Sequence, residues 1–434
     1  MQDAALHGHP EDNWFTTTPR RFKLRTEYVP VRTPEATADT FPWVGLFVLS
    51  LLVFTTVTSE FLPTGLLPEM AADLGVTQSQ IGLLITLFAA SVVLTAAPLT
   101  LLTHRFSRKS LVITVMLVFV LGNVLAAVAP NFAVLAVARV IGGCAHGLFW
   151  AVVGAYSTHL VPKHRIGRAV AITSGGGTAA FVLGVPLGTA LGQAVGWRVA
   201  FGVIAAAIVL LIVLVLRFLP PVEHGERLAT GEIALPLRKD PTIPTILLLC
   251  VIAIVAITGQ NLLATYVAPV LRGPMGFEAS AVAGMLFLYG GAGVIGIVAA
   301  GLGGDRWPRA GLIVSLALVV MAQVVLGVAP ENRWIAIPAF VVWGAAFGAV
   351  PAMLNARMMR TASLRMRDIA SAYVSTSFNL GIGLGALIGA IALDRLGAGV
   401  LPFGAALLVA LGVVVAVLGD LWLTRRSALR AQPA

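Results

Sequence analysis

Three ionisable residues lie inside long apolar stretches of this 434-residue chain. Glu60 falls in the stretch 43–67, and Arg139 and His146 fall in the stretch 132–156. A carboxylate that alternates between wetter and drier surroundings takes up and releases a proton. A guanidinium stays protonated and acts through its charge, whereas an unperturbed imidazole titrates near neutral pH. The three residue types predict proton-coupled chemistry, with Glu60, Arg139 and His146 as the proton-coupling residues.

Glu60 shares a helix face with other polar residues. Thr56, Ser59, Pro63 and Thr64 follow steps of three and four along the same stretch, a spacing that places them on one side of a helix. Pro63 has no backbone N–H, so the Ser59 carbonyl one turn earlier loses its helical partner. We expect this free acceptor beside Glu60, and we assign Thr56 to the solute-binding residues.

Each ionisable residue also has a structural interpretation that the sequence leaves open. Glu60 can be an acidic residue at the outer lip of a span, since Glu69 and Asp73 follow it. Arg139 can bind helix-end carbonyls instead of holding Glu60 or a solute oxygen. His146 can be a hydrogen-bonded packing residue instead of a second proton carrier.

The remaining candidate solute-binding residues are neutral. Trp150 continues the seam of Arg139 and His146 at helical spacing, where it can form an aromatic wall or pack in the core. Amides and hydroxyls in the second half suit a polyhydroxylated or otherwise neutral solute, although amides also join helices to one another. These second-half candidates are Gln260, Asn261, Thr265, Tyr289, Asn355 and Asn379.

Most of the chain consists of apolar segments long enough to cross a bilayer. Hydrophobic residues make up 58% of the chain and charged residues 11%, against about 25% charged in a soluble domain. Continuous apolar runs without period-two alternation favour helices over a barrel. The predicted fold is all-α, with twelve transmembrane helices as two six-helix bundles. The predicted spans are 43–67, 78–102, 109–128, 132–156, 168–193, 198–219, 243–268, 280–302, 310–328, 334–356, 369–393 and 398–423.

The two halves of the chain repeat each other at an offset of 201 residues. Gly143 then matches Gly344, and Gly147 matches Gly348, but three mismatches fall on ionisable residues. Two parallel repeats are typical of a transporter with its site between the halves near the bilayer midplane. Intramembrane charge is confined to the first half, where we expect the coupling machinery. The mismatched pairs are Glu60 with Asn261, Arg139 with Phe340, and His146 with Phe347.

The net charge of +10 follows membrane topology and does not indicate nucleic-acid binding. With a cytoplasmic amino terminus, 24 of the 29 Lys and Arg residues fall in inner segments and four fall in outer loops. This positive-inside bias predicts a multi-pass protein of the cytoplasmic membrane with both termini inside. The predicted domains are a disordered tail (1–41), a first bundle (42–219), a linker (220–242), a second bundle (243–423) and a short tail (424–434).

Several other functional classes lack support in the sequence. The spans contain no HExxH pair, no GxSxG elbow and no cluster of acidic metal ligands, so we expect no enzyme, no cofactor and no metal. The two cysteines sit in apolar spans and offer no disulfide framework. A channel is less favoured than a carrier, and the sequence leaves a non-transporting sensor open.

Four stretches resemble the major facilitator superfamily, in its twelve-spanner drug:proton antiporter branch, and are most similar to its sugar-efflux and arabinose-efflux permeases. The likeness covers about residues 42–423. It implies that Arg139 matches the arginine of the helix 4 motif, which the family links to proton transfer. Relatives carry sugars, nucleosides or drugs, so the resemblance leaves the solute open. The stretches are TSEFLPTGLLP (58–68), HGLFWAVVGAYSTHLVP (146–162), GVPLGTALGQAVGWR (184–198) and SFNLGIGLGALIGA (377–390).

The family's loop between helices 2 and 3, of the form G-x-x-x-D-R-x-G-R-K, is only partly retained. The stretch TLLTHRFSRK (100–109) has His104 and Ser107 at the Asp and Gly positions, whereas the second-half copy keeps Asp305. In the family this loop latches the halves together through charge contacts. A basic inner turn is the simpler alternative. The gating residues implied are Arg105, Arg108, Asp305, Arg306 and Arg309.

Glycine ladders mark two further helices. Gly184, Gly188, Gly192 and Gly196 repeat every four residues, as do Gly381, Gly385 and Gly389, which is a small-residue packing pattern. The first ladder with Pro186 resembles the family's antiporter motif, which implies export. Tight packing alone leaves the direction open. Gly184, Pro186 and Gly188 complete the predicted conformational residues.

The sequence as a whole predicts a proton-driven exporter of a small sugar or drug-like solute. The expected cycle is rocker-switch alternating access, with protons moving in as the solute moves out. An uncoupled facilitator or an importer of a neutral metabolite is the alternative. The expected partners are the solute, protons and the lipid bilayer, with no nucleic acid and a monomeric chain.

Overall fold

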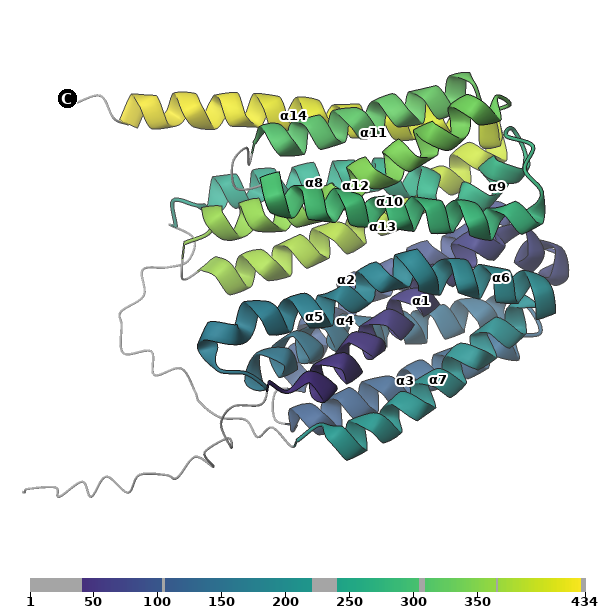
Figure 1. Ribbon diagram of the computed structural model, residues 1–434, viewed down its shortest axis with the longest axis horizontal. Helices are drawn as coiled ribbons and strands as arrows, with labels where there is room; N and C mark the ends of the chain where they lie inside the picture. The colour runs from purple at the N-terminus through teal and green to yellow at the C-terminus, as the bar shows by residue number, and fades with distance from the viewer. Residues whose placement is uncertain (1–40, 104–105, 221–239, 304–308, 364–365, 431–434) are drawn as a thin grey trace, which may run out of the picture. The chain divides into compact units, whose positions relative to one another are not determined.

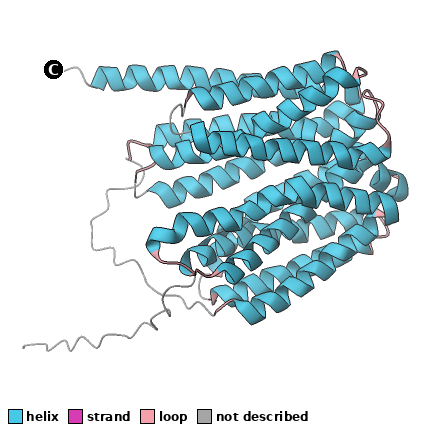
Figure 2. Cartoon of the chain, in the orientation of Figure 1, coloured by secondary structure: helices cyan, strands magenta, loops and turns pink. Residues whose placement is uncertain are grey.

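The computed structural model describes residues 41–103, 106–220, 240–303, 309–363 and 366–430. Figure 2 shows that the regular elements in these ranges are helices joined by short loops. Within these ranges, twelve helical segments are long and apolar enough to cross a membrane. The chain is therefore a multi-pass membrane protein, and the predicted all-α fold is confirmed.

The predicted spans and the observed helices agree closely in most places. The third and ninth spans, predicted at 109–128 and 310–328, are the helices Arg108–Ala127 and Ala310–Val328. The last helix continues to Arg430, past the predicted boundary at residue 423. In chain order the main helices are α1 (Trp43–Leu74), α2 (Gln78–Leu102), α3 (Arg108–Ala127), α4 (Phe132–His159), α5 (Ile166–Ala179), α6 (Val185–Val195), α7 (Trp197–Phe218), α8 (Ile243–Ala264), α9 (Val267–Arg272), α10 (Ala279–Gly303), α11 (Ala310–Val328), α12 (Arg333–Thr361), α13 (Arg367–Leu396) and α14 (Leu401–Arg430).

The halves of the membrane unit, which we call the first half (α1–α7) and the second half (α8–α14), pack by the same plan. In the first half α1 packs on α5 and α7, α2 on α4, and α3 on α4 and α7. The matching helices pair in the second half: α8 with α13 and α14, α10 with α12, and α11 with α12 and α14. Figure 1 shows the purple-to-teal helices of the first half beside the green-to-yellow helices of the second. The repeat in the sequence is thus a repeat of helix packing.

The fifth and seventh spans are interrupted helices. Ala180–Gly184 forms a π turn, η2, between α5 and α6. Pro186 follows this turn and has no N–H to bond the carbonyl four residues earlier, which favours the wider turn. In the seventh span, α8 ends at Ala264 and α9 begins at Val267. The sequence analysis predicted neither interruption.

Contacts between the halves are also reciprocal. α2 packs on α13, and α6 with η2 packs on α10, so each half contributes its second and fifth spans. At Gly290 of α10, a Cβ atom would lie 2.7 Å from the Cα of Val182 in η2. Only a glycine lets the backbones approach this closely.

The halves touch toward the end of the bundle where α1 finishes, which we call the Leu74 end. Among the described residues, the hydrogen bonds that join the halves are Ser79 to Asp394, Thr86 to the Gly383 carbonyl, and Arg272 to Glu69. Ser79 and Thr86 lie in the first part of α2, and Gly383 and Asp394 lie in the second part of α13.

Toward the opposite end, where α1 begins and which we call the Trp43 end, the contact face of α2 is uncovered. Ala97 stands 18 residues after Ser79, or five helical turns, and so shares the face that meets α13. Ala97 is nevertheless exposed, and Leu101 one turn further is 73% exposed. The halves are therefore closed at the Leu74 end and separated along α2 toward the Trp43 end.

Candidate functional site

Arg139 of α4 binds two main-chain carbonyls of α1. Its terminal nitrogens donate to the carbonyl oxygens of Ser59 (2.9 Å) and Glu60 (2.7 Å). Ser59 is the residue whose carbonyl Pro63 deprives of its helical partner. The face of Phe88 covers the guanidinium, with its carbon 4.4 Å from the ring centroid, a favourable cation–π distance. The proline of α1 thus creates an acceptor that the buried arginine uses.

The carboxyl group of Glu60 faces His146. Its Oε2 atom lies 3.4 Å from His146 Nε2. Glu60, Arg139 and His146 are 4%, 3% and 2% exposed. They therefore lie inside the first half rather than against lipid, where unpaired ionisable groups are costly.

His146 also binds Trp150, one turn further along α4. The indole Nε1–H of Trp150 donates to His146 Nε2 at 2.7 Å. Phe88 of α2 and Phe119 of α3 surround the imidazole, with ring centroids at 5.3 and 5.9 Å. Trp150 is only partly buried. The predicted seam on α4 thus becomes a connected chain from Glu60 through His146 to Trp150.

Asn123 of α3 belongs to this cluster, and the sequence analysis did not select it. The Ser59 hydroxyl donates to Asn123 Oδ1 at 2.7 Å, and Asn123 Nδ2 donates to the Phe119 carbonyl. An amide in the middle of an apolar span was the available signal, because such groups tend to bond across helices. Asn123 ties α3 to the segment of α1 that carries Glu60.

The second half has a neutral cluster at the matching place. Gln260 of α8 donates to the Tyr289 hydroxyl (2.6 Å) and accepts from Trp343 Nε1 (2.7 Å). Phe340, at the position that matches Arg139, packs edge-on against Trp343 at 5.3 Å. Gln260 and Tyr289 were predicted. Trp343 was missed because the matching residue of the first half is a glycine, Gly142, which gave no reason to select this position. Where the first half holds charges, the second half holds an amide and three aromatic rings.

The other predicted solute-binding residues occupy different surroundings. Thr56 is fully buried and donates to carbonyls of its own helix, and Thr265 is buried without a hydrogen-bond partner among the described residues. The amides of Asn261, Asn355 and Asn379 each donate to the carbonyl four residues earlier. Of these five, Asn355 is exposed. None of the hydrogen bonds of these five residues goes to Glu60, Arg139, His146 or Trp150 in the part of the chain that the structure describes.

Both glycine ladders join helices within a half. A Cβ at Gly188 would lie 2.7 Å from Leu62 of α1, and Gly184 and Gly192 face Thr58 and Leu66 of the same helix. In the second half, Gly381, Gly385 and Gly389 lie on α8 and the turn that follows it. The ladders therefore hold the fifth span on the first, and the eleventh on the seventh.

Most of the predicted gating residues lie outside the described residues: Arg105, Asp305 and Arg306 fall in the gaps 104–105 and 304–308. Arg108 and Arg309 begin α3 and precede α11. Lys109, beside Arg108, donates to the carbonyls of Leu216 and Leu219 (3.0 and 2.6 Å) and so caps the end of α7.

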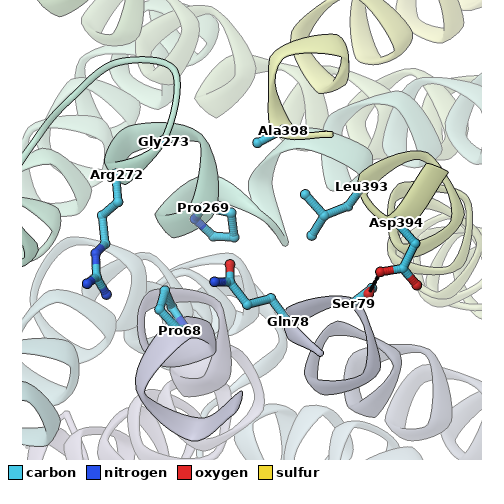
Figure 3. Close-up of a pocket in the computed structure, with 9 residues that line it drawn as sticks. All are labelled: Pro68, Gln78, Ser79, Pro269, Arg272, Gly273, Leu393, Asp394 and Ala398. Atoms are coloured by element: carbon cyan, nitrogen blue, oxygen red, sulfur yellow. Dashed lines mark hydrogen bonds between the residues drawn. The ribbon is translucent and has the colours of Figure 1, made fainter. Parts of the chain in front are cut away.

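At the Leu74 end a cleft of about 550 Å³ opens between the halves. Figure 3 shows the hydrogen bond between Ser79 and Asp394 at one side of this cleft. At the other side Arg272, which also lines the cleft, pairs with Glu69 at 2.8 Å. Among the described residues that line the cleft, none belongs to the Glu60 cluster or to the predicted solute-binding set. The cleft therefore lies at the end of the bundle where the two halves are in contact.

The described residues contain no group of three or more His, Cys, Asp or Glu side chains that could hold a metal ion. Glu60 and His146 are the titratable side chains of this cluster, and Arg139 is its cation.

Comparison with known proteins shows a family match and a curated relative that the chain covers almost in full. Residues 49–386 match the family model described as the Major Facilitator Superfamily. The chain is 32% identical over 365 residues to a probable sugar efflux transporter of Helicobacter pylori, which covers 84% of this chain and 92% of the relative.

Solved structures share the fold at lower identity. A bacterial homologue of the human lysosomal transporter Spinster, inward-facing and unoccupied, aligns with a TM-score of 0.69 and 17% identity over 92% of this chain and 99% of its own. The human organic anion transporter MFSD10 (TETRAN) aligns with a TM-score of 0.66 and 16% identity over 87% of this chain and 98% of its own. The arrangement of the helices is thus shared by proteins that differ in most residues.

Proposed function

This chain belongs to the major facilitator superfamily and is a membrane transporter rather than an enzyme, and we propose that it exports a sugar in exchange for protons. The observation that carries the proposal is the pair of buried titratable groups, Glu60 and His146, held 3.4 Å apart in one half. The matching positions of the other half are Asn261 and Phe347, which carry no proton.

A sugar is the solute class that the chain supports best. The 32% identical relative is a probable sugar efflux transporter. The cluster around Gln260 in the second half offers an amide, a hydroxyl and aromatic rings, which hydrogen-bond and stack with a neutral polyhydroxylated solute. Drug-like compounds of similar size and neutrality are the second candidate class.

The charge distribution supports an orientation in the cytoplasmic membrane with both termini inside. The 24-to-4 distribution of Lys and Arg follows the positive-inside rule. In that orientation the Leu74 end faces outward and the Trp43 end faces the cytoplasm. In this orientation the structure corresponds to an inward-open state. The outward-open state of a rocker-switch cycle would be closed at the Trp43 end and open at the Leu74 end.

The exchange of proton for solute depends on whether the Glu60 carboxyl group is protonated or ionised. A neutral carboxyl group is tolerated in a dry site, whereas an ionised one needs water or a fixed charge nearby. Arg139 supplies a fixed charge that the Ser59 and Glu60 carbonyls hold in place. Opening to the outside allows Glu60 to take up a proton, and opening to the cytoplasm allows it to release that proton as solute binds.

Uptake into inverted membrane vesicles tests the proposed direction and coupling. Vesicles from cells that express the chain are energised and given radiolabelled pentoses and hexoses. Because export in the cell becomes uptake in this preparation, we expect accumulation that an uncoupler abolishes. Vesicles from cells without the chain are the control. Equilibration that ignores the uncoupler supports the facilitator alternative and removes the antiport proposal.

A further inference from the structure

Nε2 of His146 lies beside two groups that make opposite demands on it. The indole N–H of Trp150 reaches it at 2.7 Å and requires a lone pair. Oε2 of Glu60 lies 3.4 Å away and, when ionised, requires a hydrogen on the same nitrogen. A ring nitrogen carries either a lone pair or a hydrogen in the ring plane, so it serves one of these partners at a time.

We propose that Trp150 is a positioning residue whose bond to His146 is made when Glu60 holds a proton and broken when Glu60 is ionised. The inference rests on the proposed proton coupling at Glu60 and adds the element that transmits its state. It assigns to Trp150 a connection between the proton site and the solute site.

The first state corresponds to the observed geometry. With Glu60 neutral, His146 carries its hydrogen on Nδ1, and Nε2 accepts the indole N–H of Trp150. The shorter distance to Trp150 than to Glu60 fits this tautomer. Nδ1 is buried and has no hydrogen-bond partner among the described residues. Moving the ring hydrogen away from Nδ1 therefore breaks no hydrogen bond there.

The second state follows from the strength of a charge-assisted bond. A hydrogen bond to an ionised carboxylate is roughly twice as strong as one between neutral groups. Ionised Glu60 therefore favours the tautomer with its hydrogen on Nε2, donating to Oε2. The indole N–H of Trp150 then faces another N–H and turns away.

The exchange balances with one proton. The O–H bond of Glu60 breaks and an N–H bond forms at Nε2, which gives a transient imidazolium. The N–H bond at Nδ1 then breaks and that proton passes to a water molecule, which enters when the site opens to the cytoplasm, so His146 returns to a neutral ring with its hydrogen moved. Glu60 is left ionised, and the water that accepts the proton is the one further reactant.

The groups around the imidazole leave Glu60 as its proton partner. α1 contributes Glu60, and α4 contributes Arg139, whose two observed bonds go to carbonyls. α2 and α3 present the apolar rings of Phe88 and Phe119. Because Trp150 is partly exposed while the two titratable groups are buried, its movement carries their protonation state to the surface of the first half.

The indole N–H signal of Trp150 tests the proposal without a solute. The full chain, labelled with ¹⁵N at the tryptophan indoles, is placed in nanodiscs of phosphatidylcholine and phosphatidylglycerol, and spectra are recorded across pH. Loss of one signal in Trp150→Phe assigns it. We expect this signal to move upfield as the pH rises, because the hydrogen bond is lost when Glu60 ionises. Trp343, which donates to the neutral Gln260, is the internal control and stays fixed.

Two variants separate the explanations. In Glu60→Gln the Trp150 signal loses its pH dependence, and in His146→Phe it remains at the unbonded position at every pH. Phenylalanine suits the site because Phe347 occupies the matching position of the second half. An unchanged Trp343 signal shows that each variant is folded.

The outcomes for this inference and for the proposed function are distinct. A Trp150 signal that stays fixed in the parent, or that shifts equally in Glu60→Gln, overturns the inference. With uncoupler-sensitive sugar uptake, that result leaves the proposed antiport standing. Uptake that ignores the uncoupler removes the antiport whatever the Trp150 signal does.

Discussion

Arg139 carries a permanent charge that main-chain carbonyls hold in place. The sequence left two roles open for Arg139, which are binding of carbonyls and an electrostatic role toward Glu60 or a solute. In the structure both terminal nitrogens of Arg139 bind carbonyls. The electrostatic role toward Glu60 stays a prediction, and the two roles are compatible because the guanidinium lies beside both. The freed carbonyl at Ser59 explains why an arginine is tolerated at this depth.

Replacing Arg139 by methionine tests this account through stability. Two hydrogen bonds within a membrane protein contribute about 0.6 kcal/mol each, and leaving the Ser59 carbonyl unsatisfied raises the total loss to about 1–3 kcal/mol. We expect Arg139→Met to lower the melting temperature of the detergent-solubilised protein. Arg395→Met, at an exposed position near the end of α13, is the control. Equal melting temperatures for the two variants contradict the role of Arg139 as a bridge between α4 and α1.

At the scale of the helices, glycine ladders decide which spans stay together. The Gly184–Gly188–Gly192 ladder faces α1, and Gly381–Gly385–Gly389 faces α8 and Tyr266. Both ladders therefore lie within a half. In the rocker-switch cycle that we propose, each half moves as a unit, and the contacts that change are those of α2 with α13 and of α10 with α6 and η2.

A valine at Gly188 tests the ladder. Its Cβ would lie 2.7 Å from the Cδ1 atom of Leu62, so the fully buried Leu62 side chain must repack, and overpacking of this kind costs about 1–3 kcal/mol. We expect a lower melting temperature for Gly188→Val. Gly154→Val is the matched control, because a Cβ at Gly154 has open space within 4 Å. If Gly188→Val and Gly154→Val have similar melting temperatures, the ladder is not tightly packed against α1.

Element by element, the sequence specifies the spans well and their interior breaks poorly. Length and hydropathy predicted helix Ala310–Val328 at its observed bounds, because apolar runs of this length have one stable form in lipid. The π turn at Ala180–Gly184 was missed because hydropathy averages over a whole turn. Pro186 was the local signal, and it was interpreted only as part of a motif.

The sequence identified most residues of the site, but it predicted few of the contacts between them. The position of Glu60 and His146 inside apolar spans identified them, whereas their 3.4 Å approach depends on how α1 and α4 pack. Asn123 and Trp343 complete their clusters through contacts across helices. Such contacts are set by tertiary packing, which a single sequence read without relatives does not specify.

The whole molecule alternates, in our account, by exchanging closure at the Leu74 end for closure at the Trp43 end. The two polar links at the closed end differ in strength. Arg272 and Glu69 are partly exposed, and such pairs contribute about 0–1 kcal/mol. Ser79 is 2% exposed and is bonded to Asp394 across the seam. The Ser79–Asp394 contact is therefore the better place to lock the transporter.

A cross-link at this contact tests the alternation. In a background of Cys144→Ala and Cys250→Ala, we combine Ser79→Cys with Asp394→Cys and oxidise the protein in membrane vesicles. We expect disulfide formation to abolish sugar transport and a reducing agent to restore it. Each cysteine alone is the control. Full transport by the oxidised double variant contradicts alternating access at this end.

The proton coupling assigned to Glu60 is the central claim, and one comparison in proteoliposomes tests it directly. Glu60→Gln and the parent are assayed for sugar accumulation driven by a pH gradient and for sugar exchange without a gradient. A neutral glutamine cannot carry the proton, so we predict that the variant loses accumulation and retains exchange. Accumulation by Glu60→Gln equal to that of the parent, with the same dependence on the gradient, contradicts the account.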